Sequence, residues 1–177
     1  MIFVTVGNFK GFQRLVNAVE QLKRRGVIED EVLLQVGNDA KYKSDVCKVT
    51  QFLAPDEFEH KLQEATVVIS HGGAGSIIQA LRAGKVPIVM PRRAEYHEHV
   101  DDHQLEGAQA LAAEGRIILI RETEELPAAI EKARTASQPS SRPPLKMIDL
   151  VSRAIEDLLA HPAQSVREAD HQESKKN

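Results

Sequence analysis

Cysteine, aromatic residues and long apolar runs are all scarce in this chain. Cys47 is the only cysteine among 177 residues, which excludes an internal disulfide or a CxxC metal site and fits a reducing compartment. Aromatic residues make up 4% and the net charge is −3, so neither a base-stacking platform nor a basic nucleic-acid surface is indicated. No apolar run approaches the roughly 20 residues of a membrane span, and no signal peptide is recognisable after Met1. We therefore expect a soluble, cytoplasmic protein with one main domain.

Strand-like and helix-like segments alternate along residues 1–136. Short, solidly apolar runs predict buried strands, and apolar residues at helical spacing predict the helices between them. The expected strands are residues 2–6, 32–36, 47–50, 67–69, 86–90 and 116–120. The expected helices are residues 12–25, 55–62, 74–83, 99–113 and 124–135, the third ending before Gly84. This alternation predicts an α/β fold, a Rossmann-like parallel sheet with helices on both faces.

The remainder of the chain differs in composition. Serine and proline are concentrated in residues 137–144, which predicts a linker. Apolar residues at helical spacing predict an amphipathic helix at residues 145–160, which packs either on a partner or on the chain's own sheet. Residues 161–177 are polar, and we expect them to be disordered.

The stretch Thr66–Ser76, TVVISHGGAGS, joins an apolar strand to a helix through a glycine-rich turn. Glycines let the backbone approach a ligand closely, and the first turn of a helix offers unpaired N–H groups to an anion. His71 follows the strand, at the end where ligands of open α/β sheets bind. The turn matches neither GxGxxG nor the Walker A loop. It is therefore either a phosphate or diphosphate site or a tight turn whose glycines only avoid clashes.

A second polar segment, Glu95–His103, contains three histidines and four acids. It resembles the HxHxDH signature of dinuclear zinc hydrolases, but an extra Asp precedes the last His and no comparable cluster completes the ligand set. We favour a solvated loop that enters a helix, and we expect no metal. The preceding pair, Arg92-Arg93, could meet an anionic lipid headgroup or a partner, although such pairs are more often simply exposed.

Several short motifs, taken in order, resemble the C-terminal, nucleotide-sugar-binding half of GT-B glycosyltransferases, and family 28 in particular. They are Val6-Gly7, Gln35-Val36-Gly37, Phe52-Leu53, the block Ser70–Ser76 and His103-Gln104. The resemblance covers about residues 1–135. It extends to the short soluble subunits of two-component enzymes of the dolichol-diphosphate N-acetylglucosamine and bacterial exopolysaccharide types. It implies a UDP-sugar substrate, no cofactor, and the fold of a GT-B C-terminal half.

The same resemblance implies binding roles for particular residues and identifies no catalytic residue. The implied roles are donor diphosphate binding by His71, Gly73, Gly75 and Ser76, ribose binding by Gln79, uracil binding by Phe52 and Leu53, sugar binding by His103 and Gln104, and a donor- or acceptor-facing loop at Gly7 and Asn8. Relatives usually carry a carboxylate where this chain has Gln79, and Ser or Thr where it has Asn8.

Only the donor half of a GT-B cleft is indicated, so the resemblance implies a membrane-anchored partner subunit that binds a polyprenyl-diphosphate-linked sugar acceptor. The chain would be the catalytic, donor-binding subunit of an inverting UDP-sugar glycosyltransferase, peripheral on the cytoplasmic face of a membrane. Two alternatives stay open. One is a non-catalytic nucleotide-binding or stabilising partner of a membrane glycosyltransferase, and the other is an unrelated nucleotide-binding α/β enzyme.

Overall fold

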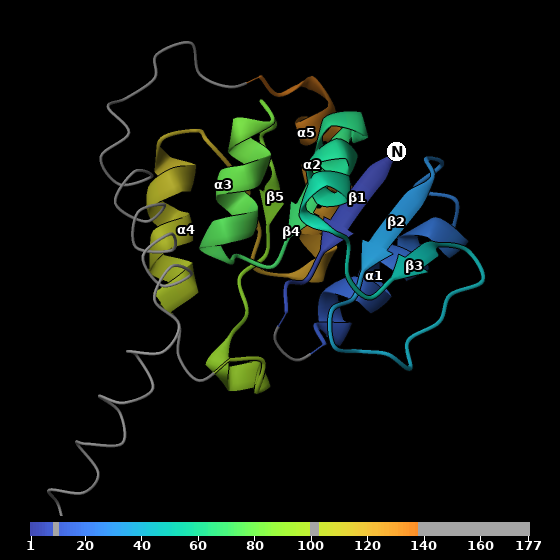
Figure 1. The fold of residues 1–177 in the computed structure, drawn as a ribbon. Coiled ribbons are helices and arrows are strands. Elements are labelled where there is room, and N and C mark those ends of the chain that lie inside the picture. The colour runs from blue at the N-terminus through green and yellow to red at the C-terminus, as the bar shows by residue number, and fades with distance from the viewer. Residues whose placement is uncertain (9–10, 100–102, 138–177) are drawn as a thin grey trace, which may run out of the picture. The chain divides into compact units, whose positions relative to one another are not determined.

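Six short strands form one parallel sheet. A computed structural model describes residues 1–8, 11–99 and 103–137 (Figure 1), so the predictions for residues 138–177 lie outside the described residues. The strands are β1 (Ile2–Thr5), β2 (Val32–Gln35), β3 (Lys48–Thr50), β4 (Val67–Ser70), β5 (Ile88–Val89) and β6 (Ile118–Leu119). Every neighbouring pair is parallel, in the order β3-β2-β1-β4-β5-β6. The predicted parallel sheet is confirmed.

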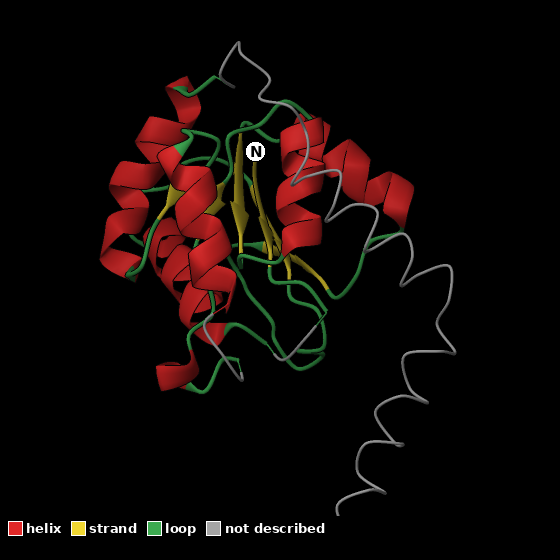
Figure 2. Ribbon diagram, turned by 90° about the vertical axis from the view of Figure 1, so that its left-hand side faces the viewer, coloured by secondary structure: helices red, strands yellow, loops and turns green. Residues whose placement is uncertain are grey.

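Helices cover both faces of this sheet, which confirms the layered α/β architecture (Figure 2). They are α1 (Gln13–Arg24), α2 (Pro55–Glu64), α3 (Ala74–Arg82), α4 (His103–Ala113) and α5 (Leu126–Thr135), with 3₁₀ turns η1 (Ala94–Tyr96) and η2 (Thr123–Glu125). The apolar faces of α1 and α5 pack on one side, against Val4, Leu34 and Ile69. The other side packs against α2, α3 and α4 through alternate strand residues such as Phe3, Val68 and Val89. Within the described residues, no helix combines the length and apolar character that crossing a membrane requires.

The element boundaries differ from the predicted ones by a few residues, mostly because the strands pair over shorter lengths. The predicted strands 86–90 and 116–120 are paired only at β5 and β6, although Met90 and Ile120 still donate backbone hydrogen bonds to the neighbouring strand. His99, which was expected inside a helix, precedes it, because α4 begins at His103. The helix that was expected to end at residue 83 ends at Arg82, and Gly84 follows it with φ +75°, a conformation typical of the residue after a helix.

The strand order reverses direction between β1 and β4. From β1 the chain proceeds outward to β2 and β3, then returns to the other side of β1 and continues through β4, β5 and β6. In open parallel sheets the connections at such a point leave in opposite directions and open a crevice at the carboxyl ends of the strands. Gly7 follows β1 and His71 follows β4, so both predicted site segments lie at this crevice.

Candidate functional site at the carboxyl edge of β1 and β4

A cavity of about 430 Å³ lies at the carboxyl edge of β1, β2 and β4. Its wall includes the residues that follow β1, the turn between β4 and α3, and the start of α2. The lining residues are Thr5, Gly7, Asn8, Gln35, Leu53, Pro55, Phe58, His71, Gly73, Gly75, Ser76 and Gln79. A cavity of this size is within the range that binds small ligands and cofactors.

The first turn of α3 faces this cavity through Gly75 and Ser76. Gly73 precedes the helix with an extended backbone, and because glycine has no side chain it cannot cap the N–H groups of the first turn. The first N–H groups of a helix have no acceptor within the helix and carry a partial positive charge. The cavity wall therefore includes the start of a helix, an element that favours anions, at the turn where the sequence predicts a phosphate or diphosphate site.

His71 lies between two glycine residues at the base of the cavity. Only 8% of its surface is exposed, and Nδ1 lies 3.3 Å from the carbonyl oxygen of Thr5. A Cβ atom added at Gly7 would lie 2.5 Å from Nε2 of the imidazole, and one added at Gly73 would overlap the same atom. Gly7 also has φ +70°, a conformation that side chains disfavour. Both glycines are therefore required for the imidazole to occupy this position.

Burial keeps the His71 imidazole neutral. Desolvation is the main cause, with the positive charge of Arg92 second, and together they lower the pKa of His71 from 6.5 to about 4. The Thr5 carbonyl can only accept a hydrogen bond, so in the neutral ring the proton belongs on Nδ1 and Nε2 carries a lone pair. Phosphate oxygens also accept hydrogen bonds. A contact between Nε2 and a diphosphate would therefore require the ring to gain a proton.

The loop after β1 is held from two directions. On one side Asn38 donates a hydrogen bond of 2.6 Å to the carbonyl oxygen of Asn8. The backbone at Gly37 passes so close to the Gly7 carbonyl that a Cβ would overlap it. On the other side Arg92 donates to the carbonyl oxygen of Val6 at 2.8 Å. The Gly7–Asn8 segment thus has a defined position beside His71.

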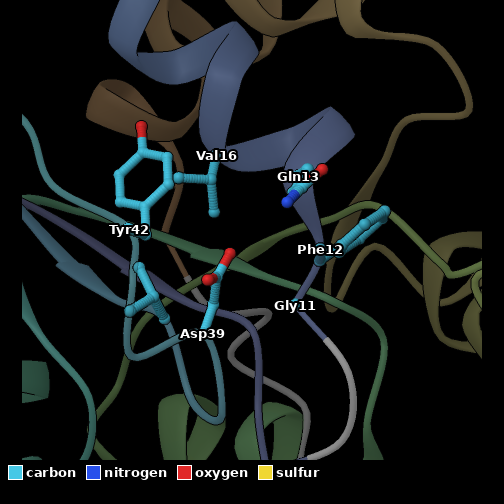
Figure 3. A pocket seen from close by; sticks show the side chains of 7 residues that line it. Gly11, Phe12, Gln13, Val16, Asp39 and Tyr42 are labelled. Atoms are coloured by element: carbon cyan, nitrogen blue, oxygen red, sulfur yellow. The ribbon is translucent and has the colours of Figure 1, made fainter.

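A smaller hollow beneath the same loop is closely packed (Figure 3). It lies between Gly11, Phe12 and the start of α1 on one side and Asp39 and Tyr42 on the other. It has no space for a water molecule, and a Cβ at Gly11 would lie 3.1 Å from a carboxylate oxygen of Asp39. This hollow is a packing contact between the start of α1 and the residues around Asp39, and we assign no ligand to it.

Most of the predicted donor-binding residues lie together at the cavity. Its lining includes Gly7, Asn8, Leu53, His71, Gly73, Gly75, Ser76 and Gln79. Phe52 is not part of the lining and is 46% exposed. Gln104 lies instead behind the β4–α3 turn, where its Oε1 would be 3.3 Å from a Cβ at Gly72. His103 begins α4, and its side chain lies outside the described part of the structure.

Four lining residues were not predicted from the sequence. They are Thr5, Gln35, Pro55 and Phe58. Two of them, Thr5 and Gln35, carried a recognisable signal, because each is a polar residue near the end of an otherwise apolar strand. Polar residues at carboxyl strand ends of a parallel sheet are positioned to meet a ligand.

The arginine pair after β5 is not simply exposed, contrary to the more common pattern. Arg92 is fully buried, donates to main-chain carbonyl groups, and lies with its guanidinium carbon 4.9 Å from the centre of the Phe12 ring. Arg93 is partly buried and forms an ion pair of 2.8 Å with Glu122. Arg92 is therefore a structural cation under the loop, and it does not present a headgroup-binding surface.

The polar segment that follows shows no metal site where it is described. Among the described residues no group of three or more His, Cys, Asp or Glu side chains could hold a metal ion. Residues 100–102 and the His103 side chain lie outside that description, so the expected absence of a metal stays a prediction.

The fold is similar to the folds of solved glycosyltransferases. The structure is similar to that of CalG4, the calicheamicin glycosyltransferase, with a TM-score of 0.57 and 18% identity over 98% of this chain and 41% of that one. The family model described as "Glycosyltransferase family 28 C-terminal domain" matches residues 1–172. The chain belongs to this family, and it is accordingly a glycosyltransferase domain.

Two curated relatives share parts of the sequence. UDP-N-acetylglucosamine transferase subunit ALG13 of Yarrowia lipolytica is 27% identical over 136 residues, which cover 71% of this chain and 67% of the relative. UDP-N-acetylglucosamine--N-acetylmuramyl-(pentapeptide) pyrophosphoryl-undecaprenol N-acetylglucosamine transferase of Bdellovibrio bacteriovorus is 35% identical over 81 residues, covering 45% of this chain and 21% of the relative. The chain thus spans two thirds of one relative and about a fifth of the other.

Proposed function

We propose that this chain is the catalytic, donor-binding subunit of an inverting UDP-sugar glycosyltransferase. The observation that carries the proposal is the cavity at the β1–β4 crevice of this family 28 domain. Its lining includes His71 and the start of α3. The name of the Yarrowia relative includes both a UDP-sugar and the word subunit, which supports a UDP-sugar donor and a partner chain.

The chemistry of sugar transfer matches what the cavity offers. When the sugar leaves a nucleotide diphosphate, negative charge grows on the departing diphosphate oxygens. The N–H groups at the start of α3 are fixed dipoles that stabilise this charge without reorganising during the reaction. We assign the diphosphate to Gly73, Gly75 and Ser76, with His71 at its flank and Gln79 at the ribose.

The acceptor side of the reaction is assigned to a second subunit. A GT-B active site is a cleft between two domains, and this chain supplies one of them. The Bdellovibrio relative is named for an acceptor on pyrophosphoryl-undecaprenol, which supports a polyprenyl-diphosphate-linked sugar as the acceptor class. We propose a membrane-anchored partner that binds this lipid, with the chain peripheral on the cytoplasmic face and the reaction serving polysaccharide biosynthesis.

A non-catalytic role is the second candidate, and one observation favours it. The cavity lining, as far as the described residues define it, contains no Asp or Glu that could serve as a general base. If the partner does not supply such a base either, the chain would bind the nucleotide or stabilise a membrane glycosyltransferase without turning over a donor.

The donor site is tested by calorimetric titration of UDP into the full chain. We expect saturable binding that is lost in His71→Ala and Gly75→Asp, because the first removes the flanking imidazole and the second places a carboxylate where the diphosphate would lie. Gly107→Asp is a matched control, since Gly107 is exposed on α4, outside the lining, and a Cβ there meets nothing within 4 Å. Absence of UDP binding by the wild-type chain, or equal binding by all variants, would contradict the proposal.

Catalysis is tested by co-expressing the chain with its membrane partner. Radiolabelled UDP-glucose, UDP-glucuronate, UDP-galactose and UDP-N-acetylglucosamine are offered with a polyprenyl-diphosphate sugar. Transfer of one sugar only when both subunits are present supports the catalytic role. UDP binding without transfer under any pairing leaves the binding role.

A further inference from the structure

The carboxyl ends of three neighbouring strands carry a row of polar side chains. Thr5 on β1 is in register with Gln35 on β2 and with Ser70 on β4. Residues in register on parallel strands point to the same face of the sheet, here the face covered by α2 and α3. The preceding row on that face is apolar, so the core changes abruptly from apolar to polar at this one position along the strands.

The oxygen atoms of this row are buried without hydrogen-bond partners. Thr5 is 1% exposed, Gln35 is 5% exposed and Ser70 is fully buried. Among the described residues, Thr5 Oγ1, Gln35 Oε1 and Ser70 Oγ accept or donate no hydrogen bond. Buried polar atoms of folded proteins are almost always paired, because an unpaired one costs free energy. Unpaired atoms of this kind next to a cavity indicate hydrogen bonds that a ligand could complete, and this applies to the members of the row that line the cavity.

Thr5 and Gln35 are part of the lining of the cavity, whereas Ser70 is not. The same wall continues into an apolar surface formed by Leu53, Pro55 and Phe58. The start of α3 lies elsewhere on the wall, where an anion is favoured. The two polar side chains thus share a cavity with one site suited to a diphosphate and another suited to a flat, largely apolar ring.

The chemistry of Gln35 Oε1 selects the part of the ligand that it contacts. An amide oxygen only accepts hydrogen bonds, so its partner must donate one. A diphosphate has no donor at neutral pH, whereas a nucleoside has ribose hydroxyl groups and, in uracil, an imide N–H. The described lining of the cavity contains no carboxylate that could accept from these groups instead. The described lining has side-chain amide oxygens at Asn8, Gln35 and Gln79, and of these three Gln35 Oε1 is the one that is buried without a partner.

We propose that Gln35, with Thr5 beside it, binds the nucleoside of the donor by accepting a hydrogen bond from a ribose hydroxyl or from the imide N–H of the base. The inference rests on the proposed function, because it places the UDP-sugar in this cavity. It adds two affinity-determining residues that lie on the strands themselves, where their position is set by the sheet rather than by a loop.

The test uses variants that keep the shape and remove the polar atoms, Gln35→Met and Thr5→Val, with Gln21→Met on the exposed face of α1 as the matched control. We expect each cavity variant to bind UDP about tenfold more weakly than wild type. We also expect unfolding midpoints equal to or higher than that of wild type, because an unpaired buried oxygen is replaced by a methyl or thioether group. A purely structural role would instead lower the midpoint.

Analogues identify the donating group. UDP is compared with 2′-deoxy-UDP, 3′-deoxy-UDP and N3-methyl-UDP, each titrated into wild type and Gln35→Met. The variant's deficit should disappear for the one analogue that lacks the contacting hydroxyl or N–H. A deficit that persists with all three analogues, no deficit with UDP, or an equal deficit with inorganic pyrophosphate would overturn the inference. Failure of wild type to bind UDP would instead overturn the proposed function.

Discussion

Protonation of His71 should destabilise the folded protein, and the effect can be isolated by substitution. The folded-state pKa of about 4 is below the ordinary value of 6.5. Below pH 6.5 the His71 ring is therefore protonated in the unfolded chain. In the folded chain it becomes protonated only when the pH approaches 4. The stabilisation is fully present above pH 6.5 and is lost as the pH falls toward 4. At about 1.4 kcal/mol per pKa unit the total is about 3 kcal/mol, of which about 2 kcal/mol is lost between pH 7 and pH 5.

The assay is urea unfolding of wild type and His71→Asn at a series of pH values. The asparagine amide can still donate to the Thr5 carbonyl oxygen, and it does not titrate. Carboxylates whose pKa is lowered by ion pairs, such as Asp30 beside Arg134, lose stabilisation at more acidic pH in both proteins and cancel in the comparison. We expect the unfolding free energy of wild type to fall by about 2 kcal/mol more than that of the variant between pH 7 and pH 5. Parallel curves over this range would refute the buried, neutral imidazole.

Two further predictions concern the same turn. Gly73→Ala should lower the unfolding free energy by about 1–3 kcal/mol, because the new methyl group overlaps the His71 ring. Gly75→Ala should leave the unfolding free energy unchanged or raise it by up to about 1 kcal/mol, because Gly75 is helical with open space around it. Equal effects of the two variants in urea unfolding would be inconsistent with the close packing at Gly73. Binding of UDP-N-acetylglucosamine at pH 7 should take up close to one proton in wild type and none in His71→Asn, because a diphosphate oxygen can pair with Nε2 only when that atom carries a proton. Titration calorimetry in two buffers of different ionisation enthalpy measures this uptake, and heats that do not depend on the buffer would show that the ring stays neutral.

The sheet and the position of the candidate site at its edge could be predicted from the sequence because both depend on local patterns. Apolar strand runs predict a parallel sheet, and the glycine-rich block after β4 predicts an anion site at the start of α3, which stays a prediction. The strand order was not deducible from those runs, since an apolar run predicts a strand without indicating which strands are its neighbours. The paired lengths of β5 and β6 were not either, because pairing ends where the neighbouring strand ends.

Long-range contacts account for the residues that sequence patterns placed incorrectly or missed. Nothing local indicates that Arg92 is buried, because its acceptors are carbonyl groups more than 80 positions earlier in the chain. The role of Thr5 and Gln35 depends on register between strands, which aligns two polar residues that are 30 positions apart. Each is recognisable in the sequence as a polar residue near the end of an apolar strand, but their alignment in one row follows only from the pairing of the strands.

The hydrogen bonds donated by Arg92 limit how short a fragment of this protein can be and still form the cavity. The described residues that line the cavity all come from the first 79 positions, so a shortened chain ending at Gly84 would retain each of these. It would nevertheless lack the guanidinium that supports the backbone at Val6 and Gly11 from the far side. Such a fragment would contain the described lining residues of the cavity but not the Arg92 side chain that positions the loop after β1. Adding residues 85–137 as a separate peptide is the route by which the assembled pocket could be restored.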